Sequence, residues 1–232
     1  MTRHLIVNAD DFGQDPGINA GVAQAHERGI VTSASLMVRG SAVDEAAAYA
    51  AANPALSMGL HLDLGEWVFR DGAWEPAYVV VDTSDADAVA AELDRQLTAF
   101  ERLLGRPPTH LDSHQHVHRD EPVRSLVLAA GRRLRVPVRQ LGAVAYRGDF
   151  YGQTGKGDPY PQAITVEALE AVLRGLPDGW TELGCHPGLG VDHLSYGAER
   201  EQEVSVLCDP DVTWVLEAEA IALQSFHDVS DT

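Results

Sequence analysis

The chain has 232 residues, of which 45% are hydrophobic, so it is long enough to bury a full core. We expect one globular domain that spans residues 1–232. Seventeen basic residues against 35 acidic ones give a formal net charge of -18, and this acidity excludes the cationic surface that binding to nucleic acid or to an anionic membrane requires.

The cysteine content and the N-terminal residues are typical of a cytoplasmic protein. Cys185 and Cys208 show no CxxC spacing, which predicts two reduced thiols rather than a disulfide framework. The first residues reach charged side chains after only a few apolar ones, so they indicate a strand and not a secretory leader. No apolar run approaches the ~20 residues of a membrane span. We therefore expect a cytoplasmic protein.

Six short apolar runs alternate with segments of helical periodicity, a pattern that predicts a parallel sheet with covering helices. The predicted strands are residues 5–9, 33–38, 58–64, 109–114, 137–143 and 181–186. The predicted helices are residues 16–28, a helix that begins after residue 41, and residues 84–104, 122–135, 165–174 and 198–207.

Start and stop signals bound several of these helices. Asp15, followed by a proline, caps the first helix, and Ser41 with Asp44 resembles a capping box. The helix that begins near residue 84 stops at Gly105. Residues 146–162 are rich in Gly, Tyr and Pro and predict a long loop, and loops of this length are usually functional or mobile.

Repeated βα units form either a closed barrel or an open sheet. No GxGxxG motif follows the first strand, so an open dinucleotide-binding sheet loses its main support. Polar residues stand at or near the carboxyl ends of four predicted strands, and in a barrel those ends converge on one mouth. They are Asp10, Asp11, His61, Asp112, His114 and His186. This distribution favours a barrel.

Asp10 and Asp11 are adjacent, and adjacent strand side chains point to opposite faces. Both reach one pocket only if the strand ends at the pair, and Phe12 and Gly13 supply the residues that turn the chain. Two carboxylates this close repel, so we expect one to be held ionised by a cation and the other to have its pKa raised toward the range of a general base. A lone aspartate would instead simply cap the turn.

Residues 110–118 read HLDSHQHVH, with four histidines and Asp112 at even positions. In one continuous strand His110 and His118 would lie roughly 26 Å apart, so they cannot share an ion. His114 can share an ion with either Asp112 or His116, because same-face neighbours lie about 6 to 7 Å apart at their bases. The stretch alone leaves that choice open.

His61 and His186 are further candidates. In MGLHLDL the leucines alternate with His61, which places His61 either inside a polar mouth or in solvent. His186 precedes Pro187 and Gly188, a sequence that fixes an imidazole at a strand end, although a structural turn histidine is the alternative. One carboxylate with two imidazoles suits Zn²⁺ or another borderline divalent ion and leaves positions open for water and substrate, as hydrolysis of an amide or ester requires.

The chain resembles the YdjC-like carbohydrate deacetylase family in five motifs, which occur in the family's order from about Leu5 to Gly188: LIVNADDFG, GIVTSASLM, MGLHLDL, PTHLDSHQHVH and CHPG. The resemblance implies a distorted, TIM-barrel-like (β/α) barrel similar to that of polysaccharide deacetylases, and a homodimer. It implies one divalent metal ion, Mg²⁺ or Zn²⁺. It also implies hydrolytic removal of an acetyl group from a small N-acetylated sugar such as N-acetylglucosamine or a chitooligosaccharide.

Position by position, the resemblance implies Asp11, His61 and His114 as the metal ligands. Asp10 matches the catalytic base of the family, and His186 matches its proposed acid. Within HLDSHQHVH only His114 is then expected to touch the ion.

Other residues are expected to contact substrate or to support the ligands. Asp112 is expected to orient a ligand or bind substrate, and the other histidines of the cluster, His110, His116 and His118, to support it or to be structural. Candidates for substrate contact are Arg139, Tyr151 and His193, with solvated surface as the simpler interpretation of Arg139 and His193. Aromatic residues in the loops either stack on a sugar or cover the edge of the core; they are Trp67, Trp74, Phe150 and Tyr151.

Two other functions remain open at this point. A metal-dependent phosphoesterase on a related barrel commonly needs a second metal and cationic phosphate clamps, which one lysine and a charge of -18 disfavour. A non-catalytic sugar- or metal-binding regulatory protein would keep the same ligands.

Overall fold

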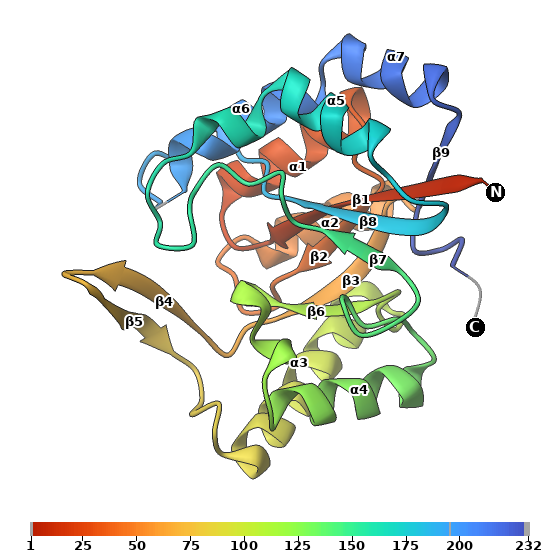
Figure 1. Ribbon diagram of the computed structural model, residues 1–232. Coiled ribbons are helices and arrows are strands. Elements are labelled where there is room, and N and C mark those ends of the chain that lie inside the picture. Colours follow the sequence, from red (N-terminus) through yellow and green to blue (C-terminus); the bar gives the residue numbers. More distant parts are fainter. Residues whose placement is uncertain (1, 195, 230–232) are drawn as a thin grey trace.

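The computed structural model describes residues 2–194 and 196–229 (Figure 1). Its centre is a seven-stranded sheet in which β6, β3, β2, β1, β8 and β7 are hydrogen-bonded in that order and β9 also pairs with β1. Every pair in this sheet is parallel. The strands are β1 (Arg3–Phe12), β2 (Ser33–Leu36), β3 (Ser57–Leu62), β6 (Leu111–Ser113), β7 (Ala145–Arg147), β8 (Gly179–Cys185) and β9 (Ile221–Gln224).

Helices surround the outside of this curled sheet (Figure 1). They are α1 (Pro16–Arg28), α2 (Val43–Ala52), α3 (Ala86–Leu104), α4 (Val123–Leu134), α5 (Val166–Arg174), α6 (Gly197–Leu207) and α7 (Pro210–Ala218). There are also two short 3-10 helices: η1 (His114–Arg119) directly follows β6, and η2 (Pro161–Ile164) directly precedes α5. The expected α/β class and barrel-like curl are confirmed: the sheet follows part of a TIM-like barrel.

The two faces of the sheet differ in chemistry. On β1 the side chains of Leu5, Val7 and Ala9 belong to the apolar core that the helices cover, whereas Asn8 and Asp10 alternate with them and point inward. Strands of parallel sheets usually bury apolar side chains on both faces. A polar inner face therefore needs internal partners for every group, and those partners make up the site.

Helix α3 shows how the outer layer is held. Its buried apolar residues recur at helical spacing, so one stripe faces the sheet; they are Val89, Leu93, Leu97 and Phe100. Burial of each such side chain contributes about 1.5 to 3 kcal/mol. The helix begins at the capping side chain of Asp85 and ends at Gly105, whose φ of 66° is the left-handed conformation that glycine adopts without strain.

Helix caps follow the expectations in part. The side chain of Asp15 accepts a hydrogen bond from the Gly17 N–H, as its position before a proline predicts. The predicted capping box at Ser41 is wrong, because α2 begins after Ala42 without a side-chain cap and the Ser41 hydroxyl donates to the carbonyl of Gln14 at 3.0 Å.

The strand predicted at residues 137–143 is wrong. Only Val138 forms a parallel bridge, to Leu111 of β6, and Gln140 then turns the chain with a φ of 60°. The next strand, β7, begins one residue before the predicted loop and overlaps its first two residues.

An antiparallel hairpin and the C-terminal elements α7 and β9 were not predicted. The hairpin consists of β4 (Gly65–Arg70) and β5 (Ala73–Val79) and projects from the sheet (Figure 1). Over the part of the chain that the structure describes, no helix is both long enough and apolar enough to cross a membrane.

Helix α1 packs tightly on the turn after β8 at Gly21. A Cβ added there would lie 2.4 Å from the backbone of Gly188, which has no room to move aside. We expect Gly21→Ala to lower the free energy of unfolding by about 1 to 3 kcal/mol, although alanine gains up to ~1 kcal/mol over glycine in a helix. Urea denaturation measures the change. The control is Gly142→Ala, whose Cβ would meet nothing closer than 3.8 Å, and equal stability of the two variants would contradict this packing.

Candidate metal and catalytic site

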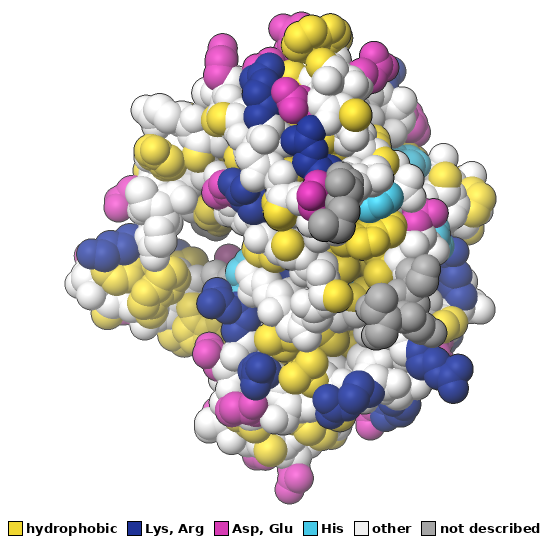
Figure 2. Space-filling model, turned by 45° about the vertical axis from the view of Figure 1, so that its right-hand side comes forward, with side chains coloured by type: hydrophobic (Ala, Val, Ile, Leu, Met, Phe, Trp, Pro, Cys, Tyr) yellow, Lys and Arg dark blue, Asp and Glu magenta, His cyan; other side chains and the backbone are white. Residues whose placement is uncertain are grey.

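A cavity of about 870 Å³ opens at the carboxyl ends of the strands, between the sheet, the β4–β5 hairpin and residues 148–157. Figure 2 shows the hollow between the projecting hairpin and the body of the molecule. The polar groups that line its inner end are Asp10, Asp11, His61, His114, His186 and Arg200.

Asp10 and Asp11 both face this cavity because β1 is irregular at its end. The pairing of β1 with β2 shifts register between Ala9 and Phe12, and Asp11 has a φ of 63°. Aspartate tolerates this left-handed conformation better than most residues. The expectation that the strand ends at the pair is wrong, because β1 continues to Phe12. The residue that redirects the side chains is Asp11 itself.

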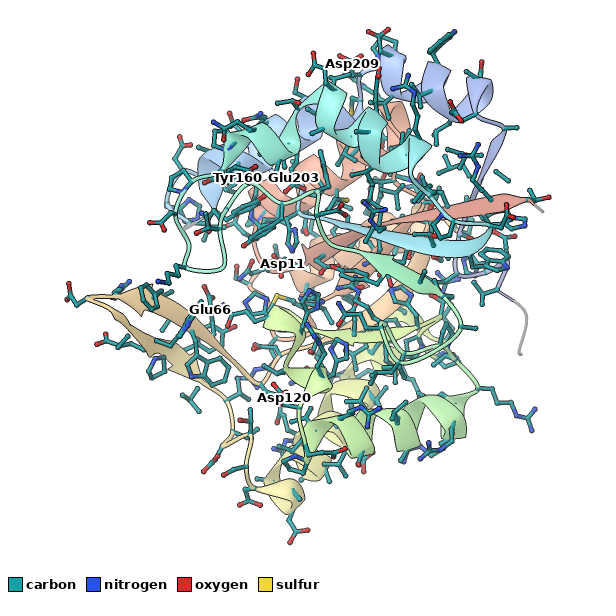
Figure 3. The ribbon with its side chains drawn as sticks, in the orientation of Figure 1. Asp11, Glu66, Asp120, Tyr160, Glu203 and Asp209 are labelled. Carbon is teal, nitrogen blue, oxygen red and sulfur yellow. The ribbon has the colours of Figure 1, made fainter. Side chains whose placement is uncertain are left out.

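Asp11, His61 and His114 meet at one point. Asp11 Oδ1 lies 3.3 Å from His61 Nε2 and 3.1 Å from His114 Nδ1. One ligand atom from each residue lies within 4.8 Å of the others. His61 is on β3 and His114 directly follows β6, so the three residues come from separate elements; Asp11, from β1, is labelled in Figure 3. The structure thus brings together the three residues that the family resemblance implies as ligands.

Asp112 sets the protonation of His61. The two residues are partners in the register of β3 and β6, and Asp112 Oδ1 lies 2.8 Å from His61 Nδ1. A carboxylate at that distance accepts the Nδ1–H, and His61 Nε2 faces Asp11 Oδ1, so without an ion the ring is protonated on both nitrogens and a bound ion would take the place of the Nε2 proton. Burial lowers the pKa of His61, but the charges of Asp112 and Asp10 outweigh it and raise the pKa to about 10. This position strongly favours a cation.

Arg139 is fully buried and joins the carboxylates of the inner face. Its Nη1 and Nη2 each lie 2.6 Å from one oxygen of Asp10, in the bidentate geometry that binds carboxylates best. Nη2 also lies 2.8 Å from Asp112, and Nε donates to Glu182 at 2.8 Å. The interpretation of Arg139 as solvated surface is therefore wrong, because buried carboxylates require an internal cation.

This pairing decides the pKa of Asp10. Burial raises the pKa of Asp10, but the charge and hydrogen bonds of Arg139 lower it below the ordinary value. The raised pKa expected for one aspartate of the pair is wrong, because arginines lower the pKa of Asp10 and of Asp11 alike. Glu182 is affected in the opposite direction, since burial raises its pKa to about 7 despite Arg139. Asp10 is ionised throughout the neutral range.

Arg200 of α6 holds the second oxygen of Asp11. Its Nη2 donates to Asp11 Oδ2, while Asp11 Oδ1 faces the two imidazoles. Burial raises the pKa of Asp11, but the charge of Arg200 and the hydrogen bonds from His114 and His61 hold it well below its usual range. Sequence reasoning missed Arg200, which lies outside every motif considered.

His186 lies at the end of β8 beside Asp10. Its Nε2 is 3.7 Å from Asp10 Oδ2, and its ring contacts Tyr151 edge-on with centroids 5.2 Å apart. Burial lowers the pKa of His186 to about 4, so the imidazole is neutral at neutral pH. Tyr151 in turn stacks on Tyr196 at 4.5 Å.

The other histidines of residues 110–118 lie outside the ligand group. His110 is buried and stacks on Phe226, and His118 Nε2 lies 3.1 Å from the carbonyl of Arg139, which it helps to place. His116 lines the cavity, where burial lowers its pKa to about 3.

The remaining candidates for substrate contact lie farther out. His193 is at the exposed rim, with Nε2 3.2 Å from Asp15 Oδ2. Trp67, Trp74, Phe150 and Tyr151 line the cavity. Phe150 is fully buried, as a residue that covers the edge of the core would be, whereas Trp74 is 54% exposed and has a ring surface open to a ligand.

Glu203 of α6 was also missed. It is fully buried and accepts hydrogen bonds from the His186 backbone N–H and from the Tyr196 hydroxyl, the latter at 2.6 Å. The Tyr196 oxygen accepts the Gly152 N–H at 2.6 Å. Glu203 therefore ties the end of β8 to the loop over the cavity. Figure 3 shows Glu203 on the helix side of Asp11.

The fold recurs in known proteins. A crystal structure of an Enterococcus faecalis V583 protein, named for cellobiose-phosphate cleavage, superposes with a TM-score of 0.80 at 25% identity and covers 98% of both chains. A family 4 carbohydrate esterase from Streptomyces lividans, solved in complex with acetate, shares the fold with a TM-score of 0.59 at 11% identity, over 95% of this chain and 91% of that chain.

Sequence comparison defines the family. The family described as YdjC-like protein matches residues 4–218, and the chain belongs to it. A protein named chitooligosaccharide deacetylase from Enterobacter sp. (strain 638) is 32% identical over 99% of this chain and 100% of its own length.

The buried carboxyl of Glu203 makes stability depend on pH. Burial raises its pKa to about 8 in the folded protein from an ordinary 4.5, so between these values the folded state keeps a proton that the unfolded state has lost. The quantity to compare is the free energy of unfolding of the wild type minus that of Glu203→Gln. This difference is expected to be greatest below pH 4.5 and to fall as the pH rises from 4.5 through 8, by up to about 1.4 kcal/mol per pH unit. Urea unfolding of both proteins across this range measures it, and a difference that does not change with pH would contradict it.

Proposed function

We propose that the protein is a metal-dependent carbohydrate deacetylase, which hydrolyses the acetamide of an N-acetylated sugar to acetate and an amino sugar. The observation that carries the proposal is the convergence of Asp11, His61 and His114 on one point of a cavity. The name of the Enterobacter relative and the fold shared with a carbohydrate esterase support the same chemistry.

The residues present fit a divalent ion held by Asp11, His61 and His114. One carboxylate and two imidazoles form a set that leaves positions free for water and substrate, and it suits Zn²⁺ better than Mg²⁺, which prefers oxygen ligands. Because Asp112 holds the Nδ1–H of His61, this residue would bind the ion through Nε2, with loss of the Nε2 proton. When bound, such an ion supplies Lewis acidity, which polarises an acyl oxygen and lowers the pKa of water.

Asp10 is placed to act as the general base. Its carboxylate is ionised, and Arg139 and the Asn8 side-chain amide, 2.8 Å away, fix its orientation. It takes a proton from the attacking water. His186 Nε2 lies 3.7 Å from Asp10, which gives that proton a short route to the departing nitrogen. The neutral imidazole of His186 holds this proton only briefly, because its lowered pKa makes the protonated ring a better proton donor than an ordinary imidazolium.

The phosphoesterase alternative is not favoured. Arg200, at the inner end of the cavity, and Arg139, buried behind Asp10, are already paired with buried carboxylates, so neither is free to clamp a phosphate. In residues 2–194 and 196–229, the other group able to hold a metal consists of Asp10, His61 and Asp112 and therefore shares His61 with the first. A two-metal mechanism needs a separate second site.

We infer the setting from the family resemblance. The protein is expected to consist of one domain, to act in the cytoplasm as a homodimer, and to take a small N-acetylated sugar as substrate. Light scattering of the purified protein tests the dimer.

The direct experiment combines metal analysis of the purified protein with an acetate-release screen. The substrates are N-acetylglucosamine, its β-linked dimer and longer oligomers. We expect one divalent ion per chain and acetate from at least one of these sugars. A loaded protein that releases no acetate from any N-acetylated sugar would contradict the proposed function and leave a sugar- or metal-binding protein.

Asp10→Asn should abolish acetate release while metal content stays unchanged. The amide keeps the shape of the side chain but cannot take a proton, and general bases contribute about 10² to 10⁴ in rate. The matched control is Glu182→Gln, which also removes a carboxylate bound to Arg139 but does not line the cavity. If Asp10→Asn kept full activity, the assigned base would be wrong; equal losses in both variants would indicate that the loss comes from Arg139.

A further inference from the structure

The β4–β5 hairpin brings a carboxylate to the outer side of His114. Glu66, the second residue of β4, has Oε2 3.8 Å from His114 Nε2. That nitrogen is buried and makes no hydrogen bond to any described residue. Glu66 points from the hairpin toward the same end of the sheet as Asp11 (Figure 3).

The two imidazoles of the ligand group then have matching surroundings. His61 directs Nε2 toward Asp11 and Nδ1 toward Asp112, whereas His114 directs Nδ1 toward Asp11 and Nε2 toward Glu66. In metal sites the ring nitrogen that does not bind the ion usually donates to a carboxylate or carbonyl, which fixes the tautomer and the ring orientation. Asp112 does this for His61.

A second link connects the hairpin to His114. Gln115 follows His114, and Trp67 follows Glu66. The Trp67 N–H donates to Gln115 Oε1 at 2.9 Å, and Gln115 Nε2 donates to the Trp67 carbonyl at 2.7 Å. This pair of hydrogen bonds holds β4 against η1 immediately beside both Glu66 and His114.

The local backbone is shaped to make that link. Gln115 has a φ of 51°, a left-handed conformation that costs a non-glycine residue about 1 to 2 kcal/mol. The pairing of β4 with β5 shifts register between Glu66 and Trp67, and such irregularities redirect side chains. Both features lie at the contact between the hairpin and η1.

We propose that Glu66 is a positioning residue for His114: its carboxylate receives the His114 Nε2–H, and Gln115 holds the hairpin where this contact forms. The inference rests on the proposed function only in that His114 binds the ion. A separation of 3.8 Å is an ion-pair distance and longer than a hydrogen bond, so a small inward movement of β4 completes the bond. Trp67 and Phe69 of the same strand line the cavity. A sugar that contacts them would therefore also affect the position of Glu66 and, through it, the orientation of His114.

The test is the dissociation constant for Zn²⁺ and for Co²⁺, measured by calorimetry without substrate. Glu66→Ala is expected to weaken binding by about 10- to 100-fold, the usual effect of losing such a partner. Glu66→Gln, which can still accept a hydrogen bond through its amide oxygen, is expected to recover part of the loss. The visible absorption of bound Co²⁺ should change in Glu66→Ala.

The matched control is Glu75→Ala, which removes an exposed carboxylate from the same hairpin, opposite Val68. It is expected to keep the wild-type dissociation constant and spectrum. Equal dissociation constants for Glu66→Ala, Glu75→Ala and the wild type would overturn the proposal. Equal weakening in both variants would overturn it as well, because the effect would then come from the hairpin's net charge.

A double-mutant cycle tests the role of Gln115. If Gln115 acts by holding Glu66, Gln115→Ala weakens ion binding in the wild type but adds little in the Glu66→Ala background. Fully additive effects would overturn the coupling between them.

Failure of this inference is distinguishable from failure of the proposed function. If Glu66→Ala weakens ion binding but the wild type releases no acetate from any sugar, the inference stands and the proposed function fails. If the wild type releases acetate and Glu66→Ala binds the ion as tightly, the proposed function stands and the inference fails. A wild type that binds no divalent ion would overturn both.

Discussion

Three aspartates, Asp10, Asp11 and Asp112, are buried where the strands end, and the protein must neutralise them internally. An unpaired carboxylate in the interior costs several kcal/mol. Arg139 pairs with Asp10 and Asp112, and Arg200 takes one oxygen of Asp11. The other oxygen of Asp11 faces two imidazoles and no third arginine. Without an ion these carboxylates keep His61 protonated, and a divalent cation would supply that positive charge instead. Asp11 would then bind the cation, while Asp10, paired with Arg139, is left to act as a base.

Much of this arrangement could be predicted because carboxyl ends of neighbouring parallel strands meet at one edge. His61 and Asp112 stand in register on adjacent strands, and His114 follows at once. The local sequence made these residues candidates, whereas the choice of His61 and His114 as ligands came from the family resemblance. The alternation in HLDSHQHVH was misleading beyond that point. β6 ends at Ser113, and the chain then turns through η1, where Gln115 and His116 have positive φ, so even positions no longer share a face.

The rest depended on tertiary pairing or on signals that were overlooked. No local sequence pattern predicts that Arg139 or Arg200 is buried, since an arginine is ordinarily exposed. Their burial depends on pairing with aspartates that are distant in the sequence. The hairpin had a usable signal in Asp71-Gly72, a pair typical of tight hairpin turns, but the fully exposed β5 lacked the apolar alternation that indicates a strand. Helix α7 begins at Asp209 and a proline, the same signal that marked the first helix.

The most direct test of the account is anomalous diffraction from a crystal of the protein grown with Zn²⁺, recorded at the zinc absorption edge. We expect one strong peak in the cavity, within bonding distance of Asp11 Oδ1, His61 Nε2 and His114 Nδ1. A cavity without such a peak, or a peak bound only by residues outside this group, would contradict it.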